Sequence, residues 1–248
     1  MRRVHTMIAA RATATSTSVR TITAMATCVA LLSGAALPTR AAAQIRNRGV
    51  SANYGWWISG GASGAVLSDI TDGASQSRWK FGSDPLYQYR GSLEKALDEF
   101  TSIGIVGGYG KVNLTMESIA AAANTKLPTA CQVSCPASTE MWTGLAQFRT
   151  GGGEGFHTLF EASAGATTFR KFSTQSDGLP IAGIKSTFDL TGTLGPGFGY
   201  SLSRNMAVTL VQDFGIGFHA KTDLPSGTGR SWRVRNTRAA IRLKFGGR

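Results

Sequence analysis

The sequence predicts an all-β fold, a transmembrane antiparallel up-and-down β-barrel of about eight strands. Three observations support it: apolar residues alternate with small or polar ones, connections are long and short in turn, and the polar face is mostly Gly, Ser and Thr. Alternation with a period of two is typical of a β-strand. Beyond the first 43 residues no run approaches the ~20 apolar residues of a membrane helix, so this chain would cross a membrane with strands.

The clearest alternation lies in residues 186–219, which predict a hairpin connected at 203–205. One side of the hairpin is apolar and carries Phe188, Leu190, Phe198, Val208, Leu210 and Phe214. The other side is Gly- and Thr-rich and includes Asp189 and Asp213. A soluble sheet buries its apolar side, whereas a membrane barrel turns that side to lipid and keeps a polar interior. A lipocalin-like soluble barrel would need apolar residues on the face that is polar here.

The other strands are expected at about 54–63, 86–95, 102–110, 142–149, 156–167 and 238–245. Long connections follow every other strand, at about 67–84, 113–139, 171–185 and 221–231. Within the second of these, 116–123 has the composition of a helical turn. Outer-membrane barrels have short periplasmic turns and longer external loops, and their strands need ~9–11 residues to cross the bilayer. The alternation of connection lengths therefore favours a membrane barrel over a soluble sandwich.

The N-terminal segment 1–43 is predicted to be a signal peptide, which leaves 44–248 as the barrel domain. It begins with Arg2 and Arg3, has an apolar core at 24–37 and ends in three alanines before Gln44. Five of the 26 basic residues and none of the 14 acidic ones lie in it, so the net charge of the remainder falls from +12 to +7. That charge is scattered, with no basic helix or aromatic–basic motif. We therefore expect no nucleic-acid partner.

With these features, residues 50–248 resemble the small eight-stranded outer-membrane barrels of Gram-negative bacteria, the OmpA/OmpX-type group. The last strand is similar to the C-terminal assembly signal of that family, because Ala239, Ile241, Leu243 and Phe245 alternate with polar or small residues. Here Gly-Gly-Arg follows the aromatic residue. The resemblance implies an outer-membrane location, both termini in the periplasm, four external loops and recognition of the last strand by the barrel-assembly machinery. Outer-membrane lipid and lipopolysaccharide are the implied surroundings; the sequence does not specify a partner for the loops.

The predicted interior contains eight charged residues: Arg90, Glu94, Arg149, Glu161, Asp189, Asp213, Arg238 and Arg242. An eight-stranded barrel is just wide enough for side chains to fill it, and buried charges need partners. We predict an internal salt-bridge network that plugs the lumen, with Asp213 beside Arg238 or Arg242 and with the Gly-rich inner face leaving room for the arginines. The alternative is a narrow ion path.

Outward aromatic residues near the predicted strand ends are expected to form girdles at the two membrane interfaces. They are Tyr54, Tyr87, Tyr89, Tyr109, Trp142, Tyr200, Phe218 and Phe245. Cys131 and Cys135 lie in a predicted loop, four residues apart. In an oxidising compartment this spacing favours a disulfide, and no His lies in the loop to complete a metal site.

An enzymatic alternative starts from His219, with Asp223 and Ser226 in the loop that follows, as a base, an orienting group and a nucleophile. Some small barrels modify lipid A with a His and a Ser, and His157 is a second histidine to consider. No nucleophile motif surrounds Ser226. We therefore expect a non-enzymatic outer-membrane protein without cofactor or metal, having a plugged polar lumen and exposed loops with a structural or surface-interaction role. A small pore is the second possibility and a lipid-A-modifying enzyme the third.

Overall fold

The computed structural model describes residues 54–120, 124–220, 223 and 228–247. The predicted signal peptide, 1–43, lies outside these ranges. No helix in the described part of the chain is long and apolar enough to cross a membrane. The elements are β1 (Trp56–Leu67), β2 (Ile70–Asp72), β3 (Ser77–Lys80), β4 (Leu86–Ala96), β5 (Thr101–Ser118), the 3₁₀ turn η1 (Thr129–Cys131), β6 (Ser134–Thr150), β7 (Gly155–Thr174), β8 (Thr187–Ser203), β9 (Met206–Phe218) and β10 (Ser231–Phe245).

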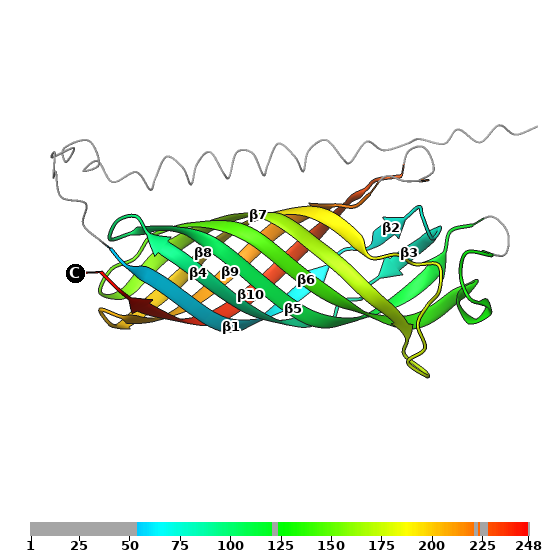
Figure 1. Cartoon of the computed structure of the whole chain (residues 1–248), viewed down its shortest axis with the longest axis horizontal. Helices are drawn as coiled ribbons and strands as arrows, with labels where there is room; N and C mark the ends of the chain where they lie inside the picture. Colours follow the sequence, from blue (N-terminus) through cyan, green and yellow to red (C-terminus); the bar gives the residue numbers. More distant parts are fainter. Residues whose placement is uncertain (1–53, 121–123, 221–222, 224–227, 248) are drawn as a thin grey trace, which may run out of the picture. The chain divides into compact units, whose positions relative to one another are not determined.

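Eight of the strands form a closed antiparallel barrel, which confirms the predicted fold class (Figure 1). Its ring runs in the order β5-β4-β1-β10-β9-β8-β7-β6 and closes by pairing of β6 with β5. The first and last barrel strands pair from Trp56 with Phe245 to Leu67 with Val234. Closure gives each of the eight ring strands a paired neighbour on both sides, which is a requirement for a sheet in lipid.

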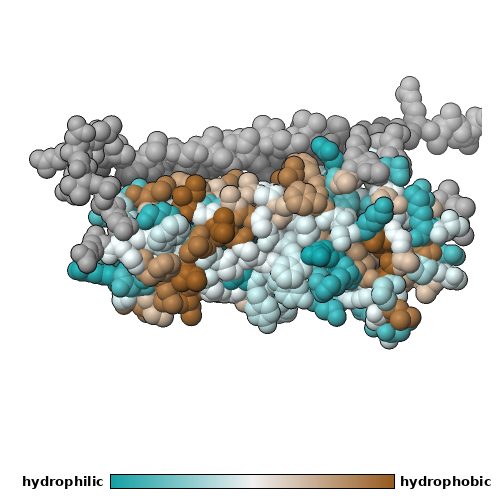
Figure 2. Space-filling model, viewed as in Figure 1, coloured by the Kyte–Doolittle hydropathy of each residue, from teal (hydrophilic) through white to brown (hydrophobic). Residues whose placement is uncertain are grey.

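The outward and inward faces of the barrel are those that the alternation predicts. Leu190 and Ile105 point outward and are 61% and 66% exposed, whereas Glu94 and Asp213 point inward and are almost fully buried. Figure 2 shows apolar residues gathered over the part of the barrel nearer the C-terminal end and polar ones towards the long loops. Since a soluble protein rarely exposes so large an apolar surface, the outer face is suited to lipid.

Several strands are longer than the ~9–11 residues that cross a bilayer. β5, β6 and β7 contain 18, 17 and 20 residues, and their extra length lies on the side of the long connections. The prediction of a helical turn at 116–123 is wrong for 116–118, which belong to β5. Met116 pairs with Cys135 and is fully buried, so it continues the inward alternation of Val112 and Leu114. Residues 121–123 lie outside the described part.

The connection after β1 was expected to be a plain polar loop. It instead contains the hairpin of β2 and β3. β3 pairs with β5 from Ser77 with Ser118 to Lys80 with Thr115, beyond the point where β4 ends its own pairing with β5. The hairpin therefore extends the barrel wall on the loop side (Figure 1). Its Trp79 is fully buried.

The loop-side part of the barrel has an apolar interior, so the expected polar lumen occupies only the other part. Its buried cluster contains Leu67, Ile70, Trp79, Phe81, Leu86, Val112, Leu114, Met116, Leu127, Cys131, Cys135, Ala137, Met141, Phe169, Phe172, Ile181 and Trp232. On the outside at this level lie charged residues such as Lys111 and Arg170. The direction of polarity thus reverses along the barrel, because strands that project into water need the ordinary apolar core of a soluble sheet.

Candidate functional site

The centre of the lumen is filled by charged side chains from five strands. Arg149 on β6 lies between two glutamates, with its Nη2 2.7 Å from Glu161 Oε1 and 3.5 Å from Glu94 Oε1. All three side chains are at most 2% exposed. Nearer the short turns, Arg242 Nη2 donates to Glu94 Oε2 at 2.8 Å. β4, β6, β7 and β10 are therefore joined across the lumen by three ion pairs, and β9 joins them through Asp213.

Asp213 connects the same network to two further arginines. Arg238 Nε and Arg90 Nη1 each lie 3.4 Å from Asp213 Oδ2. Arg238 also donates through Nη2 to Glu161. Of the two partners predicted for Asp213, the structure places Arg238 beside it, and Arg242 binds Glu94 instead. Seven of the eight predicted residues thus form one connected chain of contacts.

Neutral donors add hydrogen bonds to two of the three carboxylates, those of Glu94 and Asp213. Ser92 and Ser102 donate to the two oxygens of Glu94, each at 2.7 Å, and Asn236 Nδ2 donates to Asp213 at 3.1 Å. Four guanidinium groups share three carboxylates in this network. Buried charges are tolerated when they are paired and hydrogen-bonded in this way. The arrangement can hold the strands together across the lumen.

The inner-face glycines make room for different side chains from those expected. A Cβ at Gly195 would overlap the carboxylate of Asp213, and a Cβ at Gly217 would overlap the ring of Trp232. The expected room for arginines is therefore used by a carboxylate and by an indole. These two glycines are required by close approach of a neighbouring strand's side chain, not by backbone conformation.

Replacing Asp213 by Asn should lower the free energy of unfolding by about 2 kcal/mol, because hydrogen bonds to charged groups are worth about 1.5–3 kcal/mol. The matched control is Asp223→Asn, since Asp223 is exposed and its ion pair with Lys126 is long at 3.8 Å. That exposed pair is worth about 0–1 kcal/mol. Equal, small changes in the denaturant midpoint for both variants would contradict a stabilising network.

Asp189, the eighth predicted residue, is not part of this network. It lies nearer the loops, where His219 Nδ1 is 2.8 Å from its Oδ1 and Trp232 Nε1 donates to its Oδ2 at 2.8 Å. His219 Nε2 is in turn 3.4 Å from Asp72 Oδ1 on β2. The prediction placed Asp189 in the lumen network because the alternation gives its face but not its height along the barrel.

Electrostatics make this second cluster a buried cation between two anions. Burial alone would lower the pKa of His219, but hydrogen bonds with Asp189 and Asp72 outweigh it and raise the pKa to about 9. Burial would likewise raise the pKa of Asp72, yet hydrogen bonds with His219 and Ser75 lower it. His219 is therefore protonated at neutral pH and ties β2 to the barrel wall.

The catalytic alternative loses its geometry in this arrangement. The side chain of His219 is 1% exposed and its two ring nitrogens are directed at carboxylates. Asp223 lies near Lys126, and Ser226 is outside the described residues. His157 is on β7 at the other end of the barrel, with Nδ1 3.1 Å from the carbonyl oxygen of Gly155. A buried, protonated His219 has no free nitrogen to accept a proton from a nucleophile.

A vestibule of about 760 Å³ opens at the end of the barrel that carries the short turns. Its walls include Trp57, His157 and Lys244, and Arg149 and Arg242 of the network also line it. The guanidinium of Arg242 lies 4.5 Å from the ring centroid of Trp57. The vestibule thus reaches the charged network.

Most of the predicted girdle aromatics fall into two sets on the outer surface. Tyr87, Tyr89 and Phe218 lie towards the loop ends of their strands, whereas Tyr54, Tyr200 and Phe245 lie at the opposite end. Tyr109 and Trp142, predicted near strand ends, lie in the middle of β5 and β6, because these strands continue beyond their predicted ends. Tyr87 and Tyr89 are 76% and 75% exposed, and the rings of Tyr109 and Trp142 are 4.6 Å apart. Trp56 and Phe156, which the prediction omitted, extend the second set. Their signal was present, since both occupy outward positions at the start of a strand.

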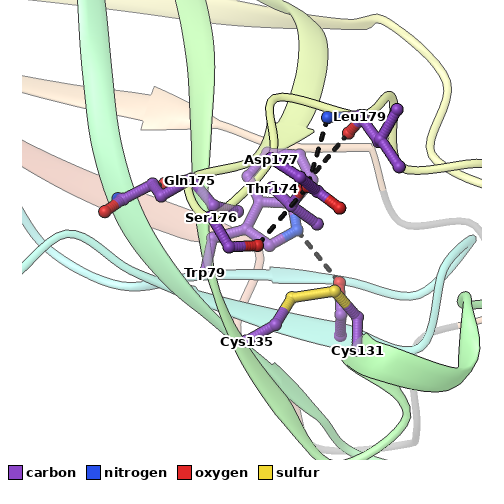
Figure 3. Close-up of a disulfide and its surroundings, with 10 residues drawn as sticks. Trp79, Cys131, Cys135, Thr174, Gln175, Ser176, Asp177 and Leu179 are labelled. Carbon is purple, nitrogen blue, oxygen red and sulfur yellow. Dashed lines mark hydrogen bonds between the residues drawn. A yellow bond between two sulfur atoms is a disulfide. The ribbon is translucent and has the colours of Figure 1, made fainter.

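Cys131 and Cys135 form a disulfide, as the spacing predicts (Figure 3). Both are buried in the apolar cluster that contains Trp79, not in an exposed loop. Cys131 ends η1 and Cys135 lies in β6. The bond therefore fixes the loop end of β6 against the core beneath it.

Replacing both cysteines by alanine should lower the free energy of unfolding by about 2 kcal/mol, since a loop this short has little closure entropy. The barrel should still fold, because the lumen network and the strand pairing do not depend on this bond. A denaturant titration of the double variant, compared with reduced and oxidised wild-type protein, measures the effect. A loss as large as that of removing a whole core side chain would contradict the purely local role.

No group of three or more His, Cys, Asp or Glu side chains within the described ranges is arranged to hold a metal ion.

Comparison with known proteins gives structural neighbours only. No protein-family model matches the chain, and no curated protein matches it. Among solved structures, Neisserial surface protein A is 13% identical over 77% of this chain and 97% of its own, with a TM-score of 0.47. The attachment invasion locus protein Ail of Yersinia pestis, in complex with a heparin analogue, is 12% identical over 77% and 99%, with a TM-score of 0.39. Outer membrane protein OprG of Pseudomonas aeruginosa is 15% identical over 79% and 98%, also at 0.39. The assignment to a closed eight-stranded barrel rests on the strand pairing described above.

Proposed function

We propose that this chain is a non-enzymatic outer-membrane barrel with a closed lumen, whose loop side serves a structural or surface-interaction role. The observation that carries the proposal is the ion-pair network from Arg90 to Arg242 in the part of the barrel with the apolar outer face. A network of paired, buried charges at this level supports a lumen without the polar channel of porins. The apolar core around Trp79 supports closure at the other end.

Orientation follows from the same asymmetry. We propose that the short turns and both chain ends lie in the periplasm and that the extended loop side lies outside the cell. The three turns 97–100, 151–154 and 204–205 are short, whereas the connections on the other side are long. A disulfide on the loop side suits an oxidising environment. The C-terminal strand, at the periplasmic end, would then be accessible to the assembly machinery.

A small pore is the second candidate, and the vestibule favours it. Conductance of refolded protein in a planar bilayer separates the two. A closed barrel should give no steady channel in symmetrical salt, whereas regular open events that disappear in Arg149→Glu would support a pore gated by the network. Heat-dependent gel migration and recovery in the outer-membrane fraction test the placement itself.

A further inference from the structure

Three exposed arginines lie just before and at the start of β10, without an ion-pair partner among the described residues. Arg230, Arg233 and Arg235 all point outward, while Trp232 between them is buried. None of the three forms an ion pair with a carboxylate of the described residues, unlike Lys80 and Lys171, which pair with glutamates. Three like charges on one short stretch repel one another, so this stretch would gain stability from an anion.

These arginines lie at the loop-side rim of the apolar outer face. Arg233 is opposite Ile216 and Arg235 is opposite Phe214 on β9. Both β9 residues are exposed and apolar, as is Phe218 at the end of that strand. The basic stretch is therefore in register with the lipid-facing surface, where headgroups of the adjoining leaflet would meet the protein.

Aromatic rings hold two of the guanidinium groups at this rim. Arg235 Cζ is 5.9 Å from the centroid of Phe214, and Arg230 Cζ is 5.9 Å from that of Phe218. Long basic side chains at a membrane boundary lay their apolar stems on such surfaces and direct the charge to the headgroups. Guanidinium groups also suit phosphate in particular, since they bind it through paired N–H donors.

We propose that Arg230, Arg233 and Arg235 form a headgroup site for a phosphorylated lipid of the leaflet on the loop side. The phosphates bind the guanidinium groups, and the acyl chains pack on Phe214, Ile216 and Phe218. A lipid satisfies both halves of this surface, whereas a free anion would use only the arginines. The inference rests on the proposed membrane placement and deepens it by assigning the contact residues.

The test compares the variant R230Q/R233Q/R235Q with R78Q/K111Q/R170Q, which removes the same charge from exposed positions on β3, β5 and β7. Detergent-folded protein is titrated with diphosphoryl lipid A in mixed micelles, and bound lipid is counted by native mass spectrometry. The first variant should bind about a hundredfold more weakly, because each of the three basic residues near a charged membrane surface contributes about 1 kcal/mol. The second should stay within about twofold of wild type, because β3, β5 and β7 are not paired with β9 or β10.

Two further arms identify the ligand class. The same lipid without phosphates should bind no better to wild type than to the arginine variant, and inorganic pyrophosphate should compete weakly. Equal lipid binding by all three proteins, or equal binding of the dephosphorylated lipid, would overturn the site. Strong binding of pyrophosphate alone would also overturn it, in favour of a soluble anion. Heat-dependent gel migration of the same samples shows whether the barrel is folded. A failure of the proposed membrane barrel can therefore be distinguished from the loss of the lipid site alone.

Discussion

Replacing Glu161 by Gln should lower the free energy of unfolding of the barrel by about 3–5 kcal/mol, the usual cost of removing one partner from a buried ion pair. Glu161 forms ion pairs with both Arg149 and Arg238, and its side chain is 1% exposed. Without its charge the network keeps four guanidinium groups but only two carboxylates. Urea titration of the refolded protein, followed by gel migration, measures the loss. Glu154→Gln, in the exposed turn immediately before β7, is the matched control and should change stability by less than about 0.5 kcal/mol.

A double variant separates charge imbalance from a general loss of packing. Arg149→Met with Glu161→Gln removes one cation together with the anion, and Glu94 keeps Arg242 at 2.8 Å. Replacement of a buried pair by groups of similar volume is often neutral. The double variant should therefore be more stable than Glu161→Gln alone. If it were as unstable as the sum of the two single changes, the residues would not be coupled and the network would not account for closure of the lumen.

The faces of the barrel strands were predictable because they depend only on a period of two. Once Leu190 is outward, Asp189 must be inward, whatever the rest of the chain does. Partners were harder to predict, because they depend on register around the whole ring. Arg238 and Arg242 are both inward on β10 and four residues apart, so the alternation alone could not decide which of them meets Asp213.

The apolar core on the loop side was missed for a different reason. Val112, Leu114 and Met116 alternate as strictly as any predicted strand, but they lie inward, on the face that was expected to be polar. A single rule for inside and outside cannot describe strands that pass from lipid into water, since the solvent changes and the apolar face must change with it. The hairpin carrying Trp79 then fills an interior that no local pattern reveals.

His219→Ala should destabilise the loop-side part of the barrel by about 3–5 kcal/mol, because it leaves two buried carboxylates without their shared cation. Asp189 would keep Trp232 as a donor, and Asp72 would keep Ser75. The ring of His219 also packs 5.2 Å from that of Trp79, so the hairpin of β2 and β3 loses a contact. Trypsin cleavage after Arg78 and Lys80 should therefore become much faster. His157→Ala, which alters a half-buried histidine at the opposite end, should leave that cleavage unchanged.

The same cluster predicts how the hairpin responds to pH. The pKa of His219 is raised from 6.5 to about 9 by its two carboxylates, in spite of burial. Its stabilisation is therefore complete below pH 6.5, declines as the pH rises and is lost above about 9. The pKa of Asp72 is lowered from 3.8. Its contribution to the stability of the hairpin is therefore present above pH 3.8 and is lost as the pH falls through the lowered pKa. Trypsin cleavage of the wild-type hairpin should accelerate between pH 7 and 9.5, whereas His219→Ala should show only the change in the activity of trypsin itself. An equal acceleration in both proteins would mean that a group other than His219 releases the hairpin.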